Sequence, residues 1–229
     1  MSIVVAIDAK TGKKIHISEY NEEDVRCLDN PEHKLIAKKG ESRTWHYCHK
    51  AGIDCTYGSK KMSDFHCYWQ RRIQPEYLEI KMKNHRADIF IDGLVIEVQH
   101  SSIDKETIKE REKFYDNMCW LFDAHDIDVI EQKKFKNLVC YKLIKGKKDF
   151  LKAKKDVYLD FNHRGLMKII KKKGIFIWCQ KISLKRIDKK LFKNKLVDGA
   201  DKRLDRPFYD LSSKTTKEET LNFIKDINN

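Results

Sequence analysis

The sequence has few residues that interrupt regular structure, and it has no long apolar run. Its 229 residues include three Pro and nine Gly, so we expect most of the chain to form helices and strands. No apolar segment is long enough to span a bilayer. The first residues lack the basic start and long apolar stretch of a secretory signal. These absences predict a soluble, cytoplasmic protein with no membrane partner.

Several functional motifs are missing as well. The sequence contains no Gly-rich phosphate loop of the P-loop or Rossmann type and no Gly-x-Ser-x-Gly element. These absences argue against nucleotide-binding folds of those two types and against a serine hydrolase built on that element. The seven cysteines are odd in number and irregular in spacing. We therefore expect reduced thiols, several of them buried, and no disulfide framework.

Positive charge is concentrated in the second half of the chain. Residues 1–130 carry 20 Lys and Arg against 23 Asp and Glu, whereas residues 131–229 carry 28 against 12. A basic half beside a mildly acidic half indicates a polyanionic partner such as nucleic acid. The alternative is Lys-rich usage from an AT-rich genome, in which the lysines only solvate the surface.

The chain divides into three parts on its local patterns. Residues 1–58 are expected to form a small β-rich module, residues 59–200 a larger core with a basic C-terminal half, and residues 201–229 a polar tail. Alternating and apolar runs predict strands at 3–7, 14–18, 34–39, 43–48, 85–91, 94–99, 119–122, 137–144, 156–160 and 174–183, and capped periodic segments predict helices at 63–74, 103–117 and 163–172. The expected fold is α/β, with a mixed central sheet flanked by helices.

The segment from Arg86 to Gln99 carries the most informative pattern. Asp92-Gly93 is a preferred two-residue hairpin turn, because a type I′ turn needs positive φ at both positions. Counting outward from this turn places Asp88 opposite Glu97 and Arg86 opposite Gln99. Directly paired residues project from the same face of a sheet. We therefore expect these four side chains to cluster.

Two carboxylates in such a pair suggest a metal site. Cβ atoms of directly opposed residues lie roughly 5 Å apart, so Asp88 and Glu97 would repel each other unless a cation lay between them. Hard oxygen ligands on a rigid strand pair suit Mg²⁺ or Mn²⁺. Such a metal polarises a phosphodiester and lowers the pKa of a bound water. The alternative is an ordinary amphipathic hairpin whose acidic residues face solvent.

The helix predicted after this hairpin adds two candidates. Ser101-Ser102 is expected to cap it. Ile108, Arg111 and Tyr115 share one helix face at i, i+3 and i+7, so Arg111 would reach back towards the strand ends and a phosphate. The alternative interpretation is a surface salt bridge for Arg111 and a core aromatic for Tyr115.

Two further polar groups are expected to be structural. Asp123, His125, Asp126 and Asp128 have the composition of a metal site, but we interpret them as a solvated turn. Asn162 is expected to cap the helix 163–172.

These segments together resemble a known family. His85-Arg-Ala-Asp-Ile, Ile96-Glu-Val-Gln-His-Ser-Ser, Arg111-Glu-Lys-Phe-Tyr and Trp120-Leu-Phe are similar to segments of the CoiA-like competence nucleases, which belong to the PD-(D/E)xK, restriction-endonuclease-like superfamily. That family has Gln where the superfamily usually has Lys. The resemblance implies a restriction-endonuclease-like core, with Ser63 and His66 on the helix that precedes it. The candidate catalytic residues are Asp88, Glu97, Gln99, Arg86, His66, Arg111 and Tyr115, with Asp88 and Glu97 as ligands of the divalent cation.

The resemblance also extends to the N-terminal module. Members of the family often carry a small zinc-ribbon-like unit with a Cys-x-x-Cys pair and a later His-Phe-Ala-His element. Here Cys27 is present, Asn30 stands at the second Cys position, and His46-Tyr-Cys-His49 matches the last element. Cys27, His46 and His49 are therefore candidate zinc ligands, and His33, Cys48 or Cys55 is a candidate replacement for the missing one. A metal-free remnant of the ribbon is the alternative.

We therefore predict a Mg²⁺- or Mn²⁺-dependent nuclease, with endonuclease activity on DNA as the leading expectation. Its partner would be single-stranded, duplex or branched DNA, including ends, junctions or recombination intermediates, bound largely through phosphates. One alternative is a non-catalytic DNA-binding protein on a degenerate nuclease fold. Another is an RNA nuclease.

Overall fold

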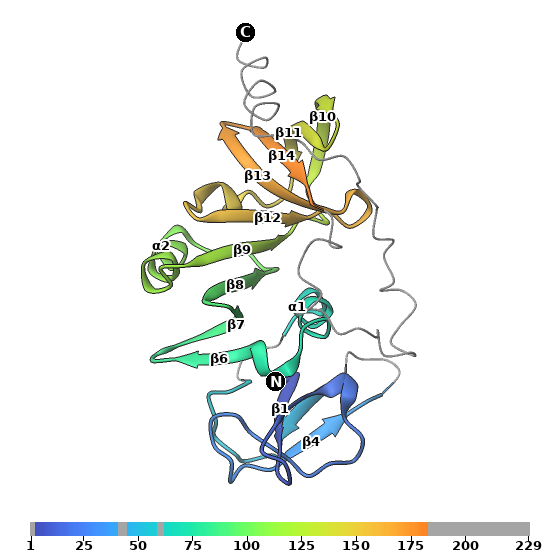
Figure 1. Cartoon of the computed structure of the whole chain (residues 1–229), viewed down its shortest axis with the longest axis vertical. Coiled ribbons are helices and arrows are strands. Elements are labelled where there is room, and N and C mark those ends of the chain that lie inside the picture. Colours follow the sequence, from blue (N-terminus) through green and yellow to red (C-terminus); the bar gives the residue numbers. More distant parts are fainter. Residues whose placement is uncertain (1–2, 41–44, 59–61, 183–229) are drawn as a thin grey trace. The chain divides into compact units, whose positions relative to one another are not determined.

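The computed structural model describes residues 3–40, 45–58 and 62–182 (Figure 1). Within these ranges the chain forms two compact units, divided between Asp92 and Gly93. Among the described helices, none is long and apolar enough to cross a membrane. The predicted tail, 201–229, and the end of the predicted core, 183–200, lie outside the described residues.

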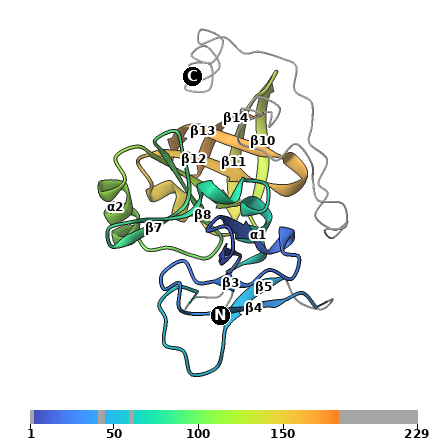
Figure 2. The same cartoon turned by 60° about the horizontal axis from the view of Figure 1, so that its bottom comes forward.

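The first unit begins with short strands. Strands β1 (Val5–Asp8), β2 (Lys14–His16) and β3 (Val25–Arg26) form one antiparallel sheet, with the 3-10 helix η1 (Ile17–Glu19) after β2. Strands β4 (Leu35–Lys38) and β5 (His46–His49) form an antiparallel pair. Bridges from Ile3 to Tyr47 and from Arg26 to Lys34 join the two sheets, which lie close together in Figure 2. Residues 3–40 and 45–58 are therefore rich in short strands, and their separation from the rest as a module of its own stays a prediction.

The same unit continues with a short helix and a strand pair. Helix α1 (Asp64–Gln70) begins at Ser63, whose Oγ accepts the N–H of His66 at 3.3 Å, as the cap prediction required. The 3-10 helix η2 (Pro75–Tyr77) leads into β6 (Leu78–Met82), which pairs antiparallel with β7 (His85–Ile91). The sequence analysis predicted β7 but missed β6.

The second unit contains a large mixed sheet. Its strands are β8 (Leu94–Gln99), β9 (Met118–Asp123), β10 (Asp128–Phe135), β11 (Leu138–Lys145), β12 (Asp156–Asp160), β13 (Leu166–Lys173) and β14 (Phe176–Lys181). In space they follow the order β10, β11, β14, β13, β12, β9, β8, with β8, β9 and β12 parallel and the other pairs antiparallel. This confirms the predicted mixed sheet.

Helices are fewer than the predicted fold implies. Within the described residues the second unit has one α-helix, α2 (Lys105–Phe114), drawn beside β8 and β9 in Figure 1, together with the 3-10 helices η3 (Asp149–Lys152) and η4 (Asn162–Arg164). Asp104 caps α2 by accepting the N–H of Thr107 at 2.7 Å, so the expected cap at Ser101-Ser102 is wrong. An acidic cap also suits the positive end of the helix dipole.

The helix predicted at 163–172 is wrong, because most of this segment forms strand β13. Leu166, Met167 and Ile169 are buried, a spacing that fits a helix turn as well as a strand. The segment pairs with β14 from Met167 to Lys173, with a register shift between Ile169 and Lys171. The turn at Gly174, with φ of +57°, closes the β13–β14 hairpin. Long-range strand pairing therefore overrides the local helical pattern.

Candidate functional site

Asp88 lies in the interior of β7 within a polar cluster of the first unit. Its Oδ2 lies 3.4 Å from His66 Nε2 on α1, and His66 Nδ1 lies 2.9 Å from Ser63 Oγ. Both side chains of the Asp88–His66 pair are about four-fifths buried. The Ser63 cap therefore fixes the imidazole, which in turn orients the carboxylate, so two of the candidate catalytic residues, His66 and Asp88, lie together.

A third acid, Glu79, lies beside Asp88 and was missed by the sequence analysis. The β6–β7 register pairs Leu78 with Ile89 and Ile80 with Ala87, so Glu79 falls opposite Asp88 by count. The Glu79 side chain is buried. Burial, together with the negative charge of Asp88, raises the pKa of its carboxyl to about 7.

Gln70 connects this buried acid to the strand that carries Asp88. Its Nε2 donates to Glu79 Oε1 at 2.6 Å and to the Asp88 carbonyl oxygen at 3.3 Å.

The Glu79 backbone has φ of +51°, a left-handed conformation that costs a non-glycine residue roughly 1 kcal/mol or more. Strain of this kind is concentrated at functional sites. The sequence signal that could have revealed Glu79 was the alternation Leu78-Glu-Ile-Lys-Met82, which is typical of a strand.

Arg86 is held by groups of the first unit. Its guanidinium forms an ion pair with Asp29, donates to the Glu79 carbonyl oxygen at 2.8 Å and lies 4.6 Å above the ring of Tyr57. Lys14 adds a second cation at the same place, where burial lowers the pKa of its ammonium to about 8. These two cations balance Glu79 and Asp29. The predicted placement of Arg86 beside Gln99 stays a prediction.

In the second unit, Glu97 is buried in β8 and pairs with Arg111 of α2. The Glu97 side chain is 1% exposed, and the Arg111 guanidinium forms an ion pair with its carboxylate. Apart from this ion pair, neither carboxylate oxygen has a hydrogen-bond partner among the described residues. Arg111 therefore reaches back to strand β8, and its contact with a phosphate stays a prediction. A buried carboxylate whose oxygens can accept further bonds is suited to bind a hard cation.

Two other predicted residues have different surroundings. Gln99, at the end of β8, donates from Nε2 to the carbonyl oxygen of Ser101 at 2.6 Å. Tyr115 is the C-cap of α2 and is buried, with its ring edge-on to Phe114 at 4.9 Å. Its environment is that of a core aromatic, the alternative interpretation stated for this residue.

The hairpin turn has the conformation that the sequence required. Asp92 and Gly93 have φ of +48° and +81°, which satisfies the two positive angles of a type I′ turn. The direct pairing of Asp88 with Glu97 involves both units and stays a prediction from the register count.

A polar network lies at the carboxyl ends of the parallel strands β8, β9 and β12. Asp123 Oδ2 lies 2.7 Å from His100 Nδ1, Asp123 Oδ1 lies 3.3 Å from His125 Nδ1, and His125 Nε2 lies 3.8 Å from Asp160 Oδ1. The carboxylates of Asp123 and Asp160 are more than nine-tenths buried. The interpretation as a solvated turn holds for the exposed Asp126 and Asp128. It is wrong for Asp123, which is buried in this network because parallel pairing gathers residues from three strands at one edge.

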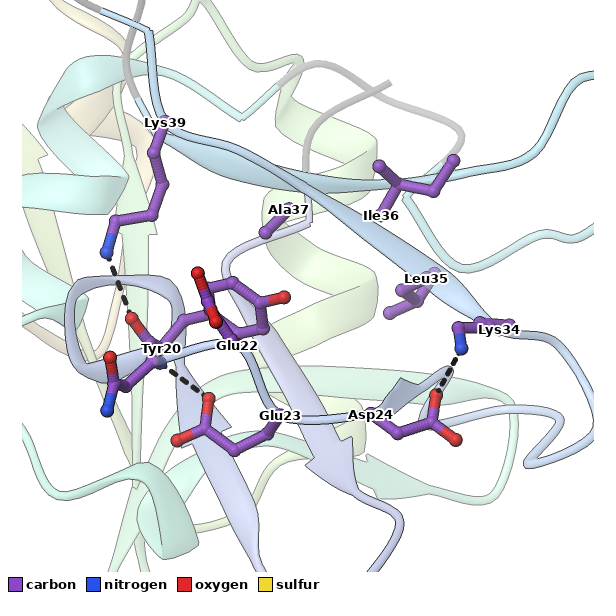
Figure 3. A pocket seen from close by; sticks show the side chains of 10 residues that line it. Tyr20, Glu22, Glu23, Asp24, Lys34, Leu35, Ile36, Ala37 and Lys39 are labelled. Carbon is purple, nitrogen blue, oxygen red and sulfur yellow. Dashed lines mark hydrogen bonds and ion pairs between the residues drawn. The ribbon is translucent and has the colours of Figure 1, made fainter.

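In the first unit, a pocket of about 640 Å³ lies between the segment 20–24 and strand β4. Figure 3 shows that both of its lysines have partners: Lys39 donates to the backbone carbonyl oxygen of Tyr20 at 2.9 Å, and Lys34 pairs with Asp24 at 3.0 Å. None of the candidate catalytic or metal-binding residues lines it. We therefore assign it no part in the candidate site.

The candidate zinc ligands of the N-terminal module separate into two groups. Cys27 and His49 lie together with Cys55, and one ligand atom from each residue lies within 4.8 Å of the other two. His46 does not belong to this group. Residues three apart on a strand project to opposite faces, so His46 and His49, at the two ends of β5, cannot both point to one metal. Cys55 is among the replacements that the sequence analysis named.

Comparison with known families agrees with the resemblance found in the sequence. Residues 58–195 match the model of a nuclease-like domain and include all the candidate catalytic residues. The matched family is described as competence protein CoiA, nuclease-like domain, and the chain belongs to this family. No curated protein and no solved structure matches the chain.

Proposed function

We propose that the protein is a divalent-metal-dependent nuclease that hydrolyses DNA phosphodiester bonds. The observation that carries this proposal is Glu97, a fully buried carboxylate in a strand of a nuclease-like domain. Its one described charge partner is Arg111, and its acceptor positions are otherwise unfilled within the described residues. An acid is stable in such surroundings only when cations compensate it.

Asp88 and Glu97 would hold the cation, as the hairpin register predicts. Carboxylates suit Mg²⁺ or Mn²⁺, which would polarise the scissile phosphodiester and lower the pKa of a bound water. His66 keeps the Asp88 carboxylate oriented through the 3.4 Å contact. Arg111 offers positive charge to a phosphate near Glu97, which matters because Gln99 can donate hydrogen bonds but carries no charge.

We further propose that DNA lies along the basic strands of the second unit. The β10–β11 hairpin exposes Lys133, Lys134, Lys136 and Lys145. Contacts of lysines with phosphates give binding that is largely independent of base sequence and weakens steeply with salt. DNA ends, junctions and recombination intermediates are the proposed substrates.

The deciding experiment compares wild type with Asp88→Ala on single-stranded, duplex and branched DNA and on matching RNA. Cleavage by wild type in Mg²⁺ or Mn²⁺, lost in the variant with binding retained, is the expected result. Asp116→Ala, whose side chain is fully exposed, serves as the matched control and should cleave normally. If the wild type cuts none of these substrates with either metal, the nuclease proposal is wrong.

One observation favours a second candidate, a DNA-binding protein without catalysis. The amide of Gln99 donates to the Ser101 carbonyl oxygen, and Gln stands where the superfamily usually has a charged Lys. In that case wild type and Asp88→Ala would bind DNA equally and neither would cut. Cleavage of the RNA substrates alone would instead identify an RNA nuclease.

A further inference from the structure

The N-terminal module contains two thiols at a separation that a single zinc ion requires. The Sγ atoms of Cys27 and Cys55 lie 3.7 Å apart, and both residues are free cysteines. A tetrahedral zinc ion with Zn–S bonds of about 2.3 Å places its two sulfurs about 3.8 Å apart. A disulfide would bring them to about 2.0 Å. The observed distance therefore matches the metal geometry and not the covalent bond.

The third group is the imidazole of His49. One of its ring nitrogens lies within 4.8 Å of both sulfurs. Both of its nitrogens are buried and neither has a hydrogen-bond partner, although a buried polar atom without a partner is costly. A metal bound at one of these nitrogens would give it the partner that it lacks.

His33 lies beside this group of three and is the candidate for a fourth ligand. Its ring lies edge-on to that of His49 with centroids 5.7 Å apart, and its Nδ1 is buried and has no hydrogen-bond partner. Its Nε2 lies 3.0 Å from the amide nitrogen of Asn30. If a metal binds Nδ1 of the neutral imidazole, the ring proton is on Nε2, which then donates a hydrogen bond instead of accepting one. The Asn30 side-chain amide must therefore rotate, so that its oxygen faces Nε2.

Local backbone geometry brings these four residues together. Cys27 follows β3, and its N–H donates to the carbonyl oxygen of His33 at 3.0 Å, closing a tight loop. The N–H of Asp29 donates to Cys27 Sγ at 3.4 Å. His49 ends β5 opposite Leu35, and a turn from Lys50 to Ile53 leads on to Cys55.

We propose that one zinc ion binds Cys27, His33, His49 and Cys55, a ligand set in which Cys55 and His33 replace the missing second Cys and His46. Two thiolates would neutralise the ion, and two imidazoles would complete a closed tetrahedron, the arrangement of a structural site. The module needs such a link, because its strands are only two to four residues long and small β-units seldom bury enough apolar surface. The proposal does not depend on nuclease activity.

The test is the zinc content of the full chain, purified under reducing conditions, dialysed with added zinc and then freed of loosely bound metal. We expect one zinc per chain by elemental analysis. Cys55→Ser and His49→Ala should each lose it, and His33→Ala should weaken zinc at least tenfold in competition with a chromophoric chelator. Cys48→Ser and His46→Ala, which alter neighbouring residues of the same strand β5, are the matched controls and should keep the full content.

Cobalt substitution provides a second measurement that is independent of folding yield. The Co²⁺ form should show the visible bands of a tetrahedral ion and a thiolate charge-transfer band, which Cys55→Ser should reduce by about half in any protein that retains cobalt. Circular dichroism would verify that each variant is folded. Wild type without stoichiometric zinc, or zinc retained by both Cys55→Ser and His49→Ala, would overturn the proposal. Loss of zinc in His46→Ala would show that the ligand set is wrong.

Discussion

The buried acid beside Asp88 leads to a quantitative prediction about stability. Glu79→Gln keeps the shape of the side chain, and the new carboxamide oxygen can still accept the hydrogen bond that Gln70 Nε2 gives to Glu79 Oε1. The substitution removes only the ability to ionise. It therefore isolates the cost of placing a negative charge in this cluster.

The magnitude follows from the pKa of Glu79, which burial together with the charge of Asp88 raises from 4.5 to about 7. One pKa unit corresponds to about 1.4 kcal/mol, so ionised Glu79 costs the folded state about 3 kcal/mol. Between pH 4.5 and 7 the folded protein holds a proton that the unfolded chain has released. The free energy of unfolding of the wild type must therefore fall as the pH rises through this window, whereas Glu79→Gln lacks this loss.

Urea unfolding from pH 4.5 to 8, followed by tryptophan fluorescence in EDTA, measures the effect. The free energy of unfolding of Glu79→Gln minus that of the wild type should grow by about 3 kcal/mol across this pH range. Glu76→Gln, which alters an exposed acid three residues earlier, should show no such trend. Parallel curves for wild type and Glu79→Gln would refute the reasoning. Under the proposed function, Mn²⁺ should shrink the difference at pH 8 by compensating the acidic cluster.

Three further changes test other parts of the structure. Arg111→Ala leaves Glu97 buried without its ion pair, so it should destabilise the fold by about 3 kcal/mol in urea titrations at pH 7; an unchanged midpoint would contradict this ion pair. Glu112→Ala removes the acceptor of an indole N–H and two backbone N–H groups, at 2.8 to 3.1 Å, and should lower the midpoint by a comparable amount. Gly146→Ala would place a Cβ 2.5 Å from a backbone carbonyl oxygen at φ of +100° and should cost well over 1 kcal/mol, whereas Gly174→Ala, with open space around it, should cost about 1 kcal/mol.

Local patterns were enough to predict the elements that carry the candidate site. The turn at Asp92-Gly93, the cap at Ser63 and the two central strands depend on interactions within a few residues, and the structure contains them. Strand β6 was missed because a single short alternation is weak evidence. Strand β10 was missed because it is mostly exposed and so has no buried apolar stripe to indicate it.

The parts of the site that the sequence could not predict depend on contacts between distant segments. Glu79 comes close to Gln70 and Asp88 only because β6 pairs with β7 and Gln70 of helix α1 reaches this pair. Asp123 meets His100 because β8 and β9 run parallel. The spacing of residues along the sequence does not by itself predict either of these two contacts. The family resemblance supplied the motif residues, but it could not supply these supporting side chains.

Under the proposed function, the charges in the second unit would explain why Gln can stand at position 99. Glu97 already has a permanent cation, Arg111, supplied from α2, so a Lys two residues along the strand would place a second positive charge at the same carboxylate. A divalent ion that binds Glu97 must share or displace this guanidinium. Displacement would free Arg111 for a phosphate, because a guanidinium binds carboxylates and phosphates with the same paired geometry. The affinity for metal should therefore be higher when DNA is present to accept Arg111, and a substrate-dependent rise in Mn²⁺ affinity would distinguish this arrangement from a preformed site.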